Sequence, residues 1–492
     1  MQRRPLQSLV RWQEPYTATG STIETMKTIR LQAVDAIWLL MESPQTPMHV
    51  GVLAIFERPE DAPEDYLIQL AATMRQARAL APPWNCRLAR PDGPSMTPRL
   101  IEERSVDLDY HFRHTALPAG GGERELGVKV SRLHSHALDR HRPLWEFHLI
   151  EGLEGGRFAF YVKVHHALVG NVNGVPMVMA ALADSAQEAA TAPLWTRPLV
   201  GGEPAAADDA GVEQRLREQF DPVAALRPLG RAASAVLTSA VKSLTTGGGL
   251  PLLRNAPPST LNRRINSQRR FATQQFELQR IERLAKASDS TLLDILIYCC
   301  GSSLRRFFKE YNALPDESLI GILPLSLQRQ GGARHGNAVA AGRVAMGTHI
   351  GDPLARLAAV KQSVRQVAED SAALPEEAFG SYVMIRGAPI YASQLRGIQH
   401  LVPPLFNLRV THITASDRPR YFSGARLQAI YPLAHLMQFS ALSIGFVSYA
   451  GMLNIGFTGA RDTLPHLQRL AVYFGKAVSD LEELVAEEEG AR

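Results

Sequence analysis

The chain has 492 residues, of which 45% are hydrophobic and 21% are charged. This length is enough for two or three folded units, and the hydrophobic fraction excludes a chain that is disordered throughout. A balance of 53 Lys and Arg against 48 Asp and Glu leaves a net charge of +5, which suits an anionic substrate or membrane surface but is too dispersed for a nucleic-acid-binding protein. Three cysteines are too few for a disulfide framework or a zinc cage, so we expect a reducing compartment.

The N-terminal segment, residues 1–25, is basic and lacks the apolar stretch of a signal peptide. We predict a loose extension there, with structured sequence from Met26; an ordered cap on the first domain is the alternative. The sequence contains no run of 18 apolar residues, so we expect no membrane-spanning helix.

Residues 26–190 alternate helix and strand signals and are predicted to form an N-terminal domain. The predicted elements are a helix in VDAIWLLMES, a strand in HVGVLAIFE, helices at Asp65–Leu80 and Glu125–Leu138, and strands at Trp145–Glu151 and Arg157–Val164 joined by a Gly-Gly turn. In the last strand, side-chain alternation places Phe158, Phe160 and Val162 on one face, with Ala159 and Tyr161 on the other.

Residues 191–262 are rich in Ala, Gly and Pro around an amphipathic stretch at 212–244, which predicts a connector with surface helices. Packing of its apolar face on its own domain is favoured over contact with a lipid surface. Residues 263–492 are predicted to form a C-terminal domain. Its elements are a strand in RFATQQFEL, a helix in STLLDILIYCCGSSLRRFFKEY with Cys299 and Cys300 as core residues, a strand in SLIGILPLSL, a helix in PLARLAAVKQSVRQVAED, strands at 405–413, 426–433, 440–448 and 451–458, and a closing helix at Leu464–Glu483.

The pair His165-His166 ends an apolar strand and precedes a Gly- and Asn-rich turn. This position predicts an imidazole at the edge of a cleft, where it can act as a general base. Neighbouring histidines project to different sides, so at most one acts directly, and a packed structural histidine is the more common role for such a residue. No third ligand follows at metal-binding spacing, so no metal site is expected.

Other segments of the chain also bear on this site. Arg142-Pro143-Leu144-Trp145-Glu146 opens the preceding strand, and Gly336-Asn337 could face His166 from the second half. A nucleophile elbow, a P-loop and a dinucleotide fingerprint are all absent from the sequence, which disfavours a serine hydrolase or an NTPase.

On these residues the chain resembles the bacterial wax ester synthase/acyl-CoA:diacylglycerol acyltransferase family. The likeness runs from about Met26 to Leu484 and is carried by VDAIWLLMESPQTPMHVG, the segment from DLDYHFRH to FYVKVHH, RRFATQQFEL, GARLQAIYP and SYAGMLNIGFTGARDTLP. The resemblance implies an α+β fold of two CoA-dependent-acyltransferase-like domains with a tunnel between them. It also implies that no cofactor is needed beyond acyl-CoA as a substrate.

The family's HHxxxDG motif implies that His166 is the general base and His165 its neighbour. The resemblance further implies that Pro143, Leu144, Trp145 and Glu146 line the acyl channel; we add Asn337 as a substrate-binding candidate. The implied partners are acyl-CoA and a long-chain alcohol or diacylglycerol, with no nucleic acid. The implied location is cytoplasmic, peripheral to the inner membrane or lipid droplets.

The chain departs from the family pattern at several positions. Gly170 and Asn171 stand where the motif has Asp and Gly, although Gly174 is kept. His412 lies in a segment that replaces an SNVPGP-like run, and Phe439 replaces part of a Gly-rich stretch. Because the motif Asp usually pairs with an arginine, Arg142 or Arg113 could be left without that partner.

These departures leave two hypotheses. One is an acyltransferase, weakened or altered in its acceptor; the other is a catalytically impaired paralogue that binds acyl-CoA or neutral lipid as a regulatory or lipid-binding protein. We favour the enzyme, because His165, His166 and the segment Pro143–Glu146 persist.

Overall fold

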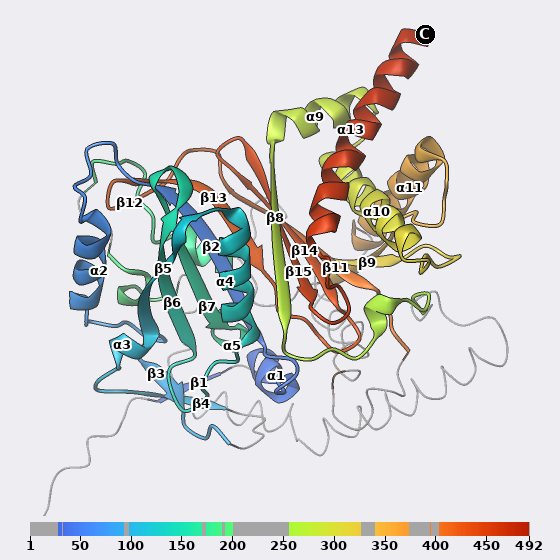
Figure 1. The fold of residues 1–492 in the computed structure, drawn as a ribbon. Helices are drawn as coiled ribbons and strands as arrows, with labels where there is room; N and C mark the ends of the chain where they lie inside the picture. Colours follow the sequence, from blue (N-terminus) through green and yellow to red (C-terminus); the bar gives the residue numbers. More distant parts are fainter. Residues whose placement is uncertain are drawn as a thin grey trace, which may run out of the picture.

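The computed structural model describes residues 28–31, 33–92, 98–169, 174–188, 192–199, 255–325, 340–372, 394 and 403–491. These residues form two lobes, each built around a six-stranded sheet (Figure 1). The α+β class and the two sheet-rich domains predicted from the sequence are confirmed. The amphipathic stretch at 212–244 lies outside the described residues.

The N-terminal lobe contains a mixed sheet in the order β12-β13-β2-β7-β6-β5 and a small sheet in the order β1-β4-β3. Its elements are β1 (Thr28–Arg30), α1 (Ala33–Met41), β2 (His49–Glu57), α2 (Tyr66–Gln76), β3 (Cys86–Leu88), β4 (Arg99–Glu102), α3 (Leu108–His111), β5 (Phe112–Gly121), α4 (Glu123–Ser135), β6 (Trp145–Leu153), β7 (Arg157–His165), α5 (His166–Val169) and α6 (Gly174–Met179), with 3₁₀ turns at Glu154–Gly156 and Leu194–Thr196.

The C-terminal lobe contains a sheet in the order β10-β9-β11-β14-β15-β8. The elements after residue 255 are a 3₁₀ turn at Thr260–Asn262, β8 (Arg269–Glu277), α9 (Leu278–Ala287), α10 (Leu292–Glu310), β9 (Ile320–Leu325), β10 (Ala340–Ala345), α11 (Pro353–Ala372), β11 (Leu408–Ser416), β12 (Tyr421–Phe422), β13 (Ala425–Leu433), β14 (Leu442–Tyr449), β15 (Met452–Ala460) and α13 (Gln468–Ala491). Cys299 and Cys300 are buried in α10 as free thiols, as the sequence predicted, and burial raises the pKa of both.

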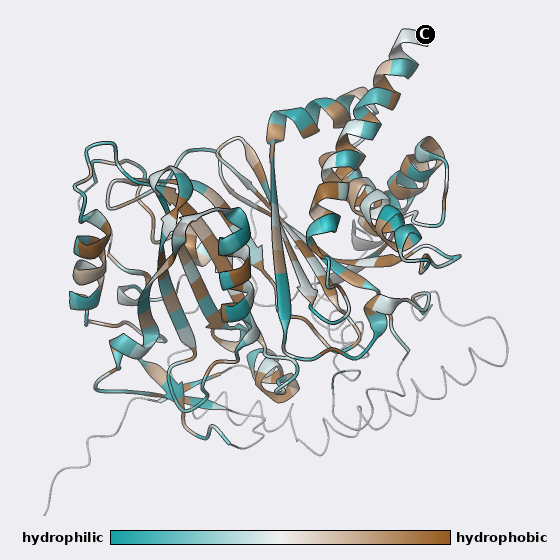
Figure 2. Ribbon diagram, in the orientation of Figure 1, coloured by the Kyte–Doolittle hydropathy of each residue, from teal (hydrophilic) through white to brown (hydrophobic). Residues whose placement is uncertain are grey.

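The central strands of the N-terminal sheet are buried on both faces. Phe158, Phe160 and Val162 of β7 belong to one hydrophobic cluster, while Ala159 and Tyr161 belong to another on the opposite face. This confirms the alternation predicted for this strand. Figure 2 shows hydrophobic positions gathered along β2, β6 and β7.

Strands β12 and β13 cross from the C-terminal half of the sequence into the N-terminal sheet. In β13, Arg426 pairs with Glu57 and Leu433 with Gly51, antiparallel to β2. By sequence these strands fall in the segment 263–492, yet in space they complete the other lobe. The N-terminal lobe is therefore built from both halves of the chain, whereas every strand of the C-terminal sheet comes from the second half.

Helix α4 of the N-terminal lobe lies along β8, the edge strand of the C-terminal sheet. The hydroxyl of Ser131 accepts from the backbone N–H of Phe271 at 2.9 Å, and that of Ser135 accepts from Arg269 at 2.8 Å. Gly127 stands one turn before Ser131, and a Cβ there would lie 3.6 Å from the carbonyl oxygen of Phe271. Small residues at every fourth position thus let the helix approach and satisfy the exposed edge of the strand.

Candidate active site

The His165-His166 pair is held at the end of β7 by the two neighbouring chain segments. The backbone N–H of His165 donates to the carbonyl of Leu144 at 2.9 Å, and that of His166 donates to the carbonyl of Met48 at 2.8 Å. Consecutive residues of a strand hydrogen-bond to opposite sides, so the segments leading into β6 and β2 fix one histidine each.

His165 is fully buried, and both of its ring nitrogens face protein groups. Its Nδ1 accepts from the backbone N–H of Ala167 at 3.1 Å, so the ring proton lies on Nε2, which faces Oε1 of Glu42 at 3.5 Å. Burial raises the pKa of the Glu42 carboxyl, but His165, the N–H of Met48 and Arg140 together lower it below the usual range. Because both ring nitrogens face protein groups, we interpret His165 as a residue that orients the site.

His166 has a different environment. Its side chain is half-buried, and its ring stacks on Trp38 of α1 with centroids 4.0 Å apart. Burial lowers its pKa to about 3, with further lowering from the charges of Arg409 and His165. Within the described residues its Nδ1 has no hydrogen-bond partner. The ring is therefore neutral at pH 7.

A second histidine lies against His166. The ring of His435, in the segment after β13, is edge-on to that of His166 with centroids 4.9 Å apart. Arg409 of β11 donates from Nη1 to Nε2 of His435 at 3.0 Å and from Nη2 to its carbonyl at 2.6 Å. We name Trp38, His166, Arg409 and His435 the His166 group. Of these four residues only His166 was predicted from the sequence, because the other three come from distant segments with no local motif.

An apolar cluster adjoins the His166 group through Trp38. It contains residues of both lobes, so it spans their junction. Its buried members are Met41, Met48, Ile322, Phe406 and Met437, with Ile37, Trp38, Ile320 and Leu405 packed against them.

The segment Pro143–Glu146, predicted to line the acyl channel, is buried in the N-terminal lobe. Leu144 packs in a cluster with Leu39 and Ala167, next to the His pair. The ring of Trp145 stacks on His111 with centroids 4.5 Å apart, and its Nε1 donates to the carbonyl of Trp84 at 2.8 Å. In the structure these residues pack in the core and support His165. Their contact with substrate stays a prediction.

Glu146 neutralises a buried lysine. Its Oε2 lies 3.0 Å from Nζ of Lys163, 3.2 Å from Nε2 of His148 and 3.8 Å from Nη1 of Arg113. Burial raises the pKa of Glu146, but His148, Lys163 and Arg113 outweigh burial and bring the pKa to about 2. Its carboxylate is occupied by protein cations.

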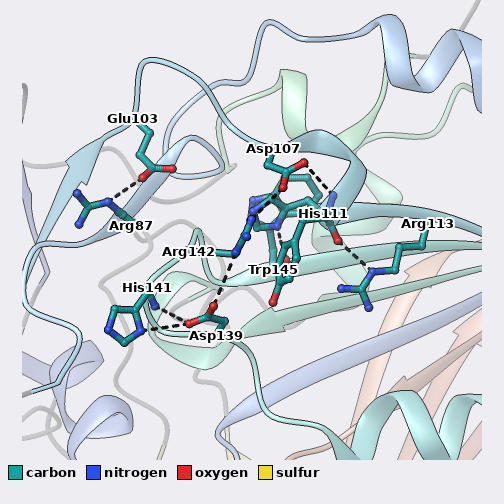
Figure 3. A network of polar contacts seen from close by, with 10 residues as sticks. Arg87, Glu103, Asp107, His111, Arg113, Asp139, His141, Arg142 and Trp145 are labelled. Atoms are coloured by element: carbon teal, nitrogen blue, oxygen red, sulfur yellow. Dashed lines mark hydrogen bonds and ion pairs between the residues drawn. The ribbon is translucent and has the colours of Figure 1, made fainter. Parts of the chain in front are cut away.

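The two arginines considered as partners of the missing motif Asp already contact other carboxylates. Arg142 lies 3.1 Å from Asp107 and 3.7 Å from Asp139 (Figure 3). Its guanidinium also lies over the ring of Tyr110. Arg113 faces Glu146. Neither is left unpaired, and Gly170 and Asn171 themselves lie outside the described residues.

The remaining predicted positions divide as follows. Asn337 lies outside the described residues. His412 stands three residues after Arg409 in regular strand register, so it points to the opposite face, where its Nε2 lies 2.9 Å from Oγ of Ser448. Phe439 has a φ of +61°, a left-handed conformation that favours glycine, in line with the Gly-rich stretch expected there.

Gly174, the motif glycine that is kept, lies at a close approach of two elements. A Cβ on this residue would lie 2.8 Å from a methyl group of Val52 in β2. Helix α6 therefore needs a glycine at this point to pack on the sheet behind the His pair.

In the described part of the chain, no group of three or more His, Cys, Asp and Glu side chains could hold a metal ion. The helices of that part are all too short or too polar to cross a bilayer.

Comparison with known families gives two consecutive matches. Residues 31–296 match the wax ester synthase/diacylglycerol acyltransferase catalytic domain, and residues 335–482 match the C-terminal domain of the same family. A putative diacylglycerol O-acyltransferase of Mycobacterium tuberculosis is 39% identical over 483 residues, which cover 92% of this chain and 97% of the relative. A relative of the same description from Mycobacterium bovis is 35% identical over 463 residues, with 92% and 98% covered.

Solved structures give the same result. The wax ester synthase/diacylglycerol acyltransferase from Marinobacter aquaeolei VT8 superposes with a TM-score of 0.75 at 30% identity, over 93% of this chain and all of that one. The first condensation domain of the CDA synthetase, at 16% identity and a TM-score of 0.50 over 93% of this chain and 95% of that one, shares the fold.

Proposed function

Because the chain belongs to the wax ester synthase/diacylglycerol acyltransferase family and is an acyltransferase, we propose that it moves a fatty acyl group from acyl-CoA to the hydroxyl of a long-chain alcohol or a diacylglycerol. His166 is the general base of this reaction. The observation that supports the assignment is the state of this ring, which is neutral and half-buried, with an Nδ1 that is itself buried and has no partner in the described structure.

In this mechanism the acceptor hydroxyl gives its proton to His166 while its oxygen attacks the thioester carbon. A C–O bond forms and the carbonyl electron pair moves onto oxygen. The tetrahedral intermediate then collapses with cleavage of the C–S bond, and the CoA thiolate takes the proton back from His166. No acyl-enzyme forms, which agrees with the absence of a nucleophile elbow in the sequence.

The low pKa of His166 keeps its base form available at neutral pH, but it makes the protonated ring costly. Negative charge that develops on the nearby thioester oxygen offsets this cost during the attack, since opposite charges at short distance favour the charged imidazole. The positive charge on His166 and the negative charge on the thioester oxygen arise and disappear together.

The apolar cluster at the lobe junction supports long-chain substrates. Side chains of Met, Ile, Leu and Phe pack together beside Trp38. Burial of an acyl chain among apolar side chains of this kind would stabilise the complex by about 0.8 kcal/mol per methylene. Long-chain alcohols and diacylglycerols are dissolved in membranes, so the enzyme works at the surface of the inner membrane or of a lipid droplet.

The test is a CoA-release assay with acyl-CoA and either hexadecanol or a dispersed diacylglycerol. The parent protein is expected to release free CoA, and His166→Ala is expected to lose about 10²–10⁴-fold in kcat. His141→Ala, which removes an exposed imidazole, is the matched control and keeps the parent rate. An equal rate for His166→Ala and the parent would exclude the base role. Saturable acyl-CoA binding without CoA release would select the non-catalytic lipid-binding protein.

A further inference from the structure

His435 is held in one tautomer by Arg409. A guanidinium can only donate hydrogen bonds, so Nε2 of His435, 3.0 Å from Nη1 of Arg409, must accept. The proton of the neutral imidazole therefore lies on Nδ1. Burial lowers the pKa of His435 well below its usual value, and the charge of Arg409 adds to this effect, so the ring stays neutral.

The Nδ1–H of His435 is a buried donor without an acceptor among the described residues. The residue is only 3% exposed. Burying an unpaired donor costs about 1–3 kcal/mol, and such groups are rare in folded proteins. His49 and His148 also have an unpartnered Nδ1, but each uses its proton at Nε2, toward the carbonyl of His134 and the carboxylate of Glu146. His435 differs from both because its unpartnered nitrogen carries the proton.

The distance between the rings of His435 and His166 suits one shared reaction centre. A general base lies about 3 Å from the attacking hydroxyl, and an oxyanion donor lies about 3 Å from the oxygen that becomes charged. These two oxygens are bonded to the same carbon in the tetrahedral intermediate. Rings with centroids 4.9 Å apart can therefore contact one oxygen each.

We propose that the Nδ1–H of His435 donates a hydrogen bond to the thioester carbonyl oxygen of acyl-CoA and to the oxyanion formed from it, and that Arg409 is the positioning residue that holds this tautomer. The proposal rests on the proposed function. No proton leaves His435, and its hydrogen bond strengthens as the carbonyl electron pair moves onto oxygen.

This assignment divides the chemistry between the two histidines. The Nε2 lone pair of His435 is occupied by Arg409, so this ring cannot accept a proton from the acceptor hydroxyl. His166 makes no such contact with an arginine donor in the described structure. The positive charge of Arg409, next to His435, also stabilises the oxyanion. The same charge disfavours a protonated imidazole and so lowers the pKa of both His166 and His435.

The kinetic test compares two substitutions at position 435. His435→Phe keeps the ring volume and removes the donor, and we expect kcat to fall about 10²–10³-fold with little change in the KM for acyl-CoA. His435→Gln keeps an N–H donor and should recover part of the loss. An unchanged kcat in His435→Phe, or a loss confined to KM, would overturn the proposal.

A spectroscopic test separates a contact with the carbonyl from a general packing effect. Acyl-CoA labelled with ¹³C at the thioester carbonyl is bound to His166→Ala, which does not consume it, and to His166→Ala/His435→Phe. Hydrogen bonding lowers a carbonyl stretching frequency, so the band should move to higher frequency in the double variant. An identical band in both variants would contradict the assignment.

Arg409→Met supplies a third arm, which is needed if His435→Phe does not fold. It keeps the imidazole but removes the group that occupies Nε2, and we expect kcat to fall about 10–100-fold, as for other residues that orient a reacting group. An unchanged kcat would count against the proposal. A parent enzyme that is active and depends on His166 but not on His435 would leave the proposed function standing and reject this inference alone.

Discussion

His134 and His166 have the same depressed pKa for the same reason and yet stand in different chemical situations. Burial brings the pKa of each to about 3. His134 is saturated, because its Nδ1 accepts from the hydroxyl of Tyr161 at 2.8 Å and its Nε2 donates to the carbonyl of Ala434 at 3.1 Å. His166 is half-buried and its Nδ1 has no partner in the described structure. A shifted pKa reports burial in both, and the unpartnered nitrogen together with the partial exposure of the side chain separates the candidate base from the structural residue.

The two environments are adjacent. Ala434 supplies the carbonyl that holds His134, and the next residue, His435, contacts His166. Strand β2 contributes His49 beside His134, and His49 pairs across the sheet with His165. One end of the N-terminal sheet thus carries His134, with both ring nitrogens hydrogen-bonded, and His166, with an unpartnered Nδ1, and substitution can test whether their roles differ as their contacts do.

The largest expected difference appears when each histidine is replaced by phenylalanine. His166→Phe should lose about 10²–10⁴-fold in kcat with nearly unchanged stability. His134→Phe leaves the Tyr161 hydroxyl and the Ala434 carbonyl without partners, which costs about 1–3 kcal/mol for each, while the folded fraction keeps its kcat. Steady-state kinetics and urea unfolding measure both effects. Loss of kcat in a folded His134→Phe would break the comparison.

A second test extends the structural side of the comparison to Glu146. Lys163→Met removes a cation from a buried pair and should lower the free energy of unfolding by about 3–5 kcal/mol. The double variant Lys163→Met/Glu146→Gln should recover most of this loss, because no buried carboxylate then remains. If Glu146→Gln instead raises the KM for acyl-CoA and leaves stability unchanged, Glu146 contacts substrate as the sequence predicted.

The pH dependence of stability should be alike for the two histidines. Their folded pKa of about 3 lies below the usual 6.5, so the unfolded chain binds protons first and stability falls as the pH drops from 6.5 toward 3. Each histidine contributes a slope of about 1.4 kcal/mol per pH unit within this window. Urea unfolding at pH 7, 6 and 5 measures this slope. His134→Phe and His166→Phe should each lower the slope of the free energy of unfolding by the contribution of one histidine.

The pH dependence of activity should involve His166 alone. Its base form is complete above pH 6, so kcat/KM measured between pH 6 and pH 8 should show no titration of the base with a pKa near 6.5. An acid limb centred near pH 6.5 that disappears in His166→Gln would show that the ring is more accessible to water than its contacts indicate.

The smallest expected effect concerns α4, the helix that carries His134. Ser131→Ala leaves the backbone N–H of Phe271 in β8 without its acceptor and should lower the free energy of unfolding by about 1 kcal/mol, with kcat unchanged. Arg132→Ala, on the exposed side of the same helix, is the control. A change in kcat without a change in stability would connect α4 to the chemistry.

Local sequence patterns predicted the elements that carry the site. The strand of His165 and the helix of VDAIWLLMES have their own hydrophobic periodicity, and the predicted strand Arg157–Val164 matches β7 to within one residue. The short strands β1, β3 and β4 were missed, since strands of three or four residues carry too little periodicity to stand out. The longer strands β5 and β10 and helix α9 were also missed.

The constellation around His166 could not be predicted in the same way. Trp38, Arg409 and His435 meet through tertiary contacts between segments far apart in the chain, and no spacing in the sequence encodes such a meeting. The pairing of β13 with β2 is of the same kind, because the alternation of a strand gives its buried face but not its neighbour. The role of Glu146 likewise became visible only with Lys163 beside it.

The crossing of β13 has a consequence for synthesis of the protein. Until residues 425–433 leave the ribosome, β2 has a bare edge, because its partner on that side is β13. A nascent chain must keep this edge from pairing with other chains while most of the polypeptide is still being made, and closure over such a separation is slow. The N-terminal sheet can therefore be completed only late in synthesis, after most of the chain has been made.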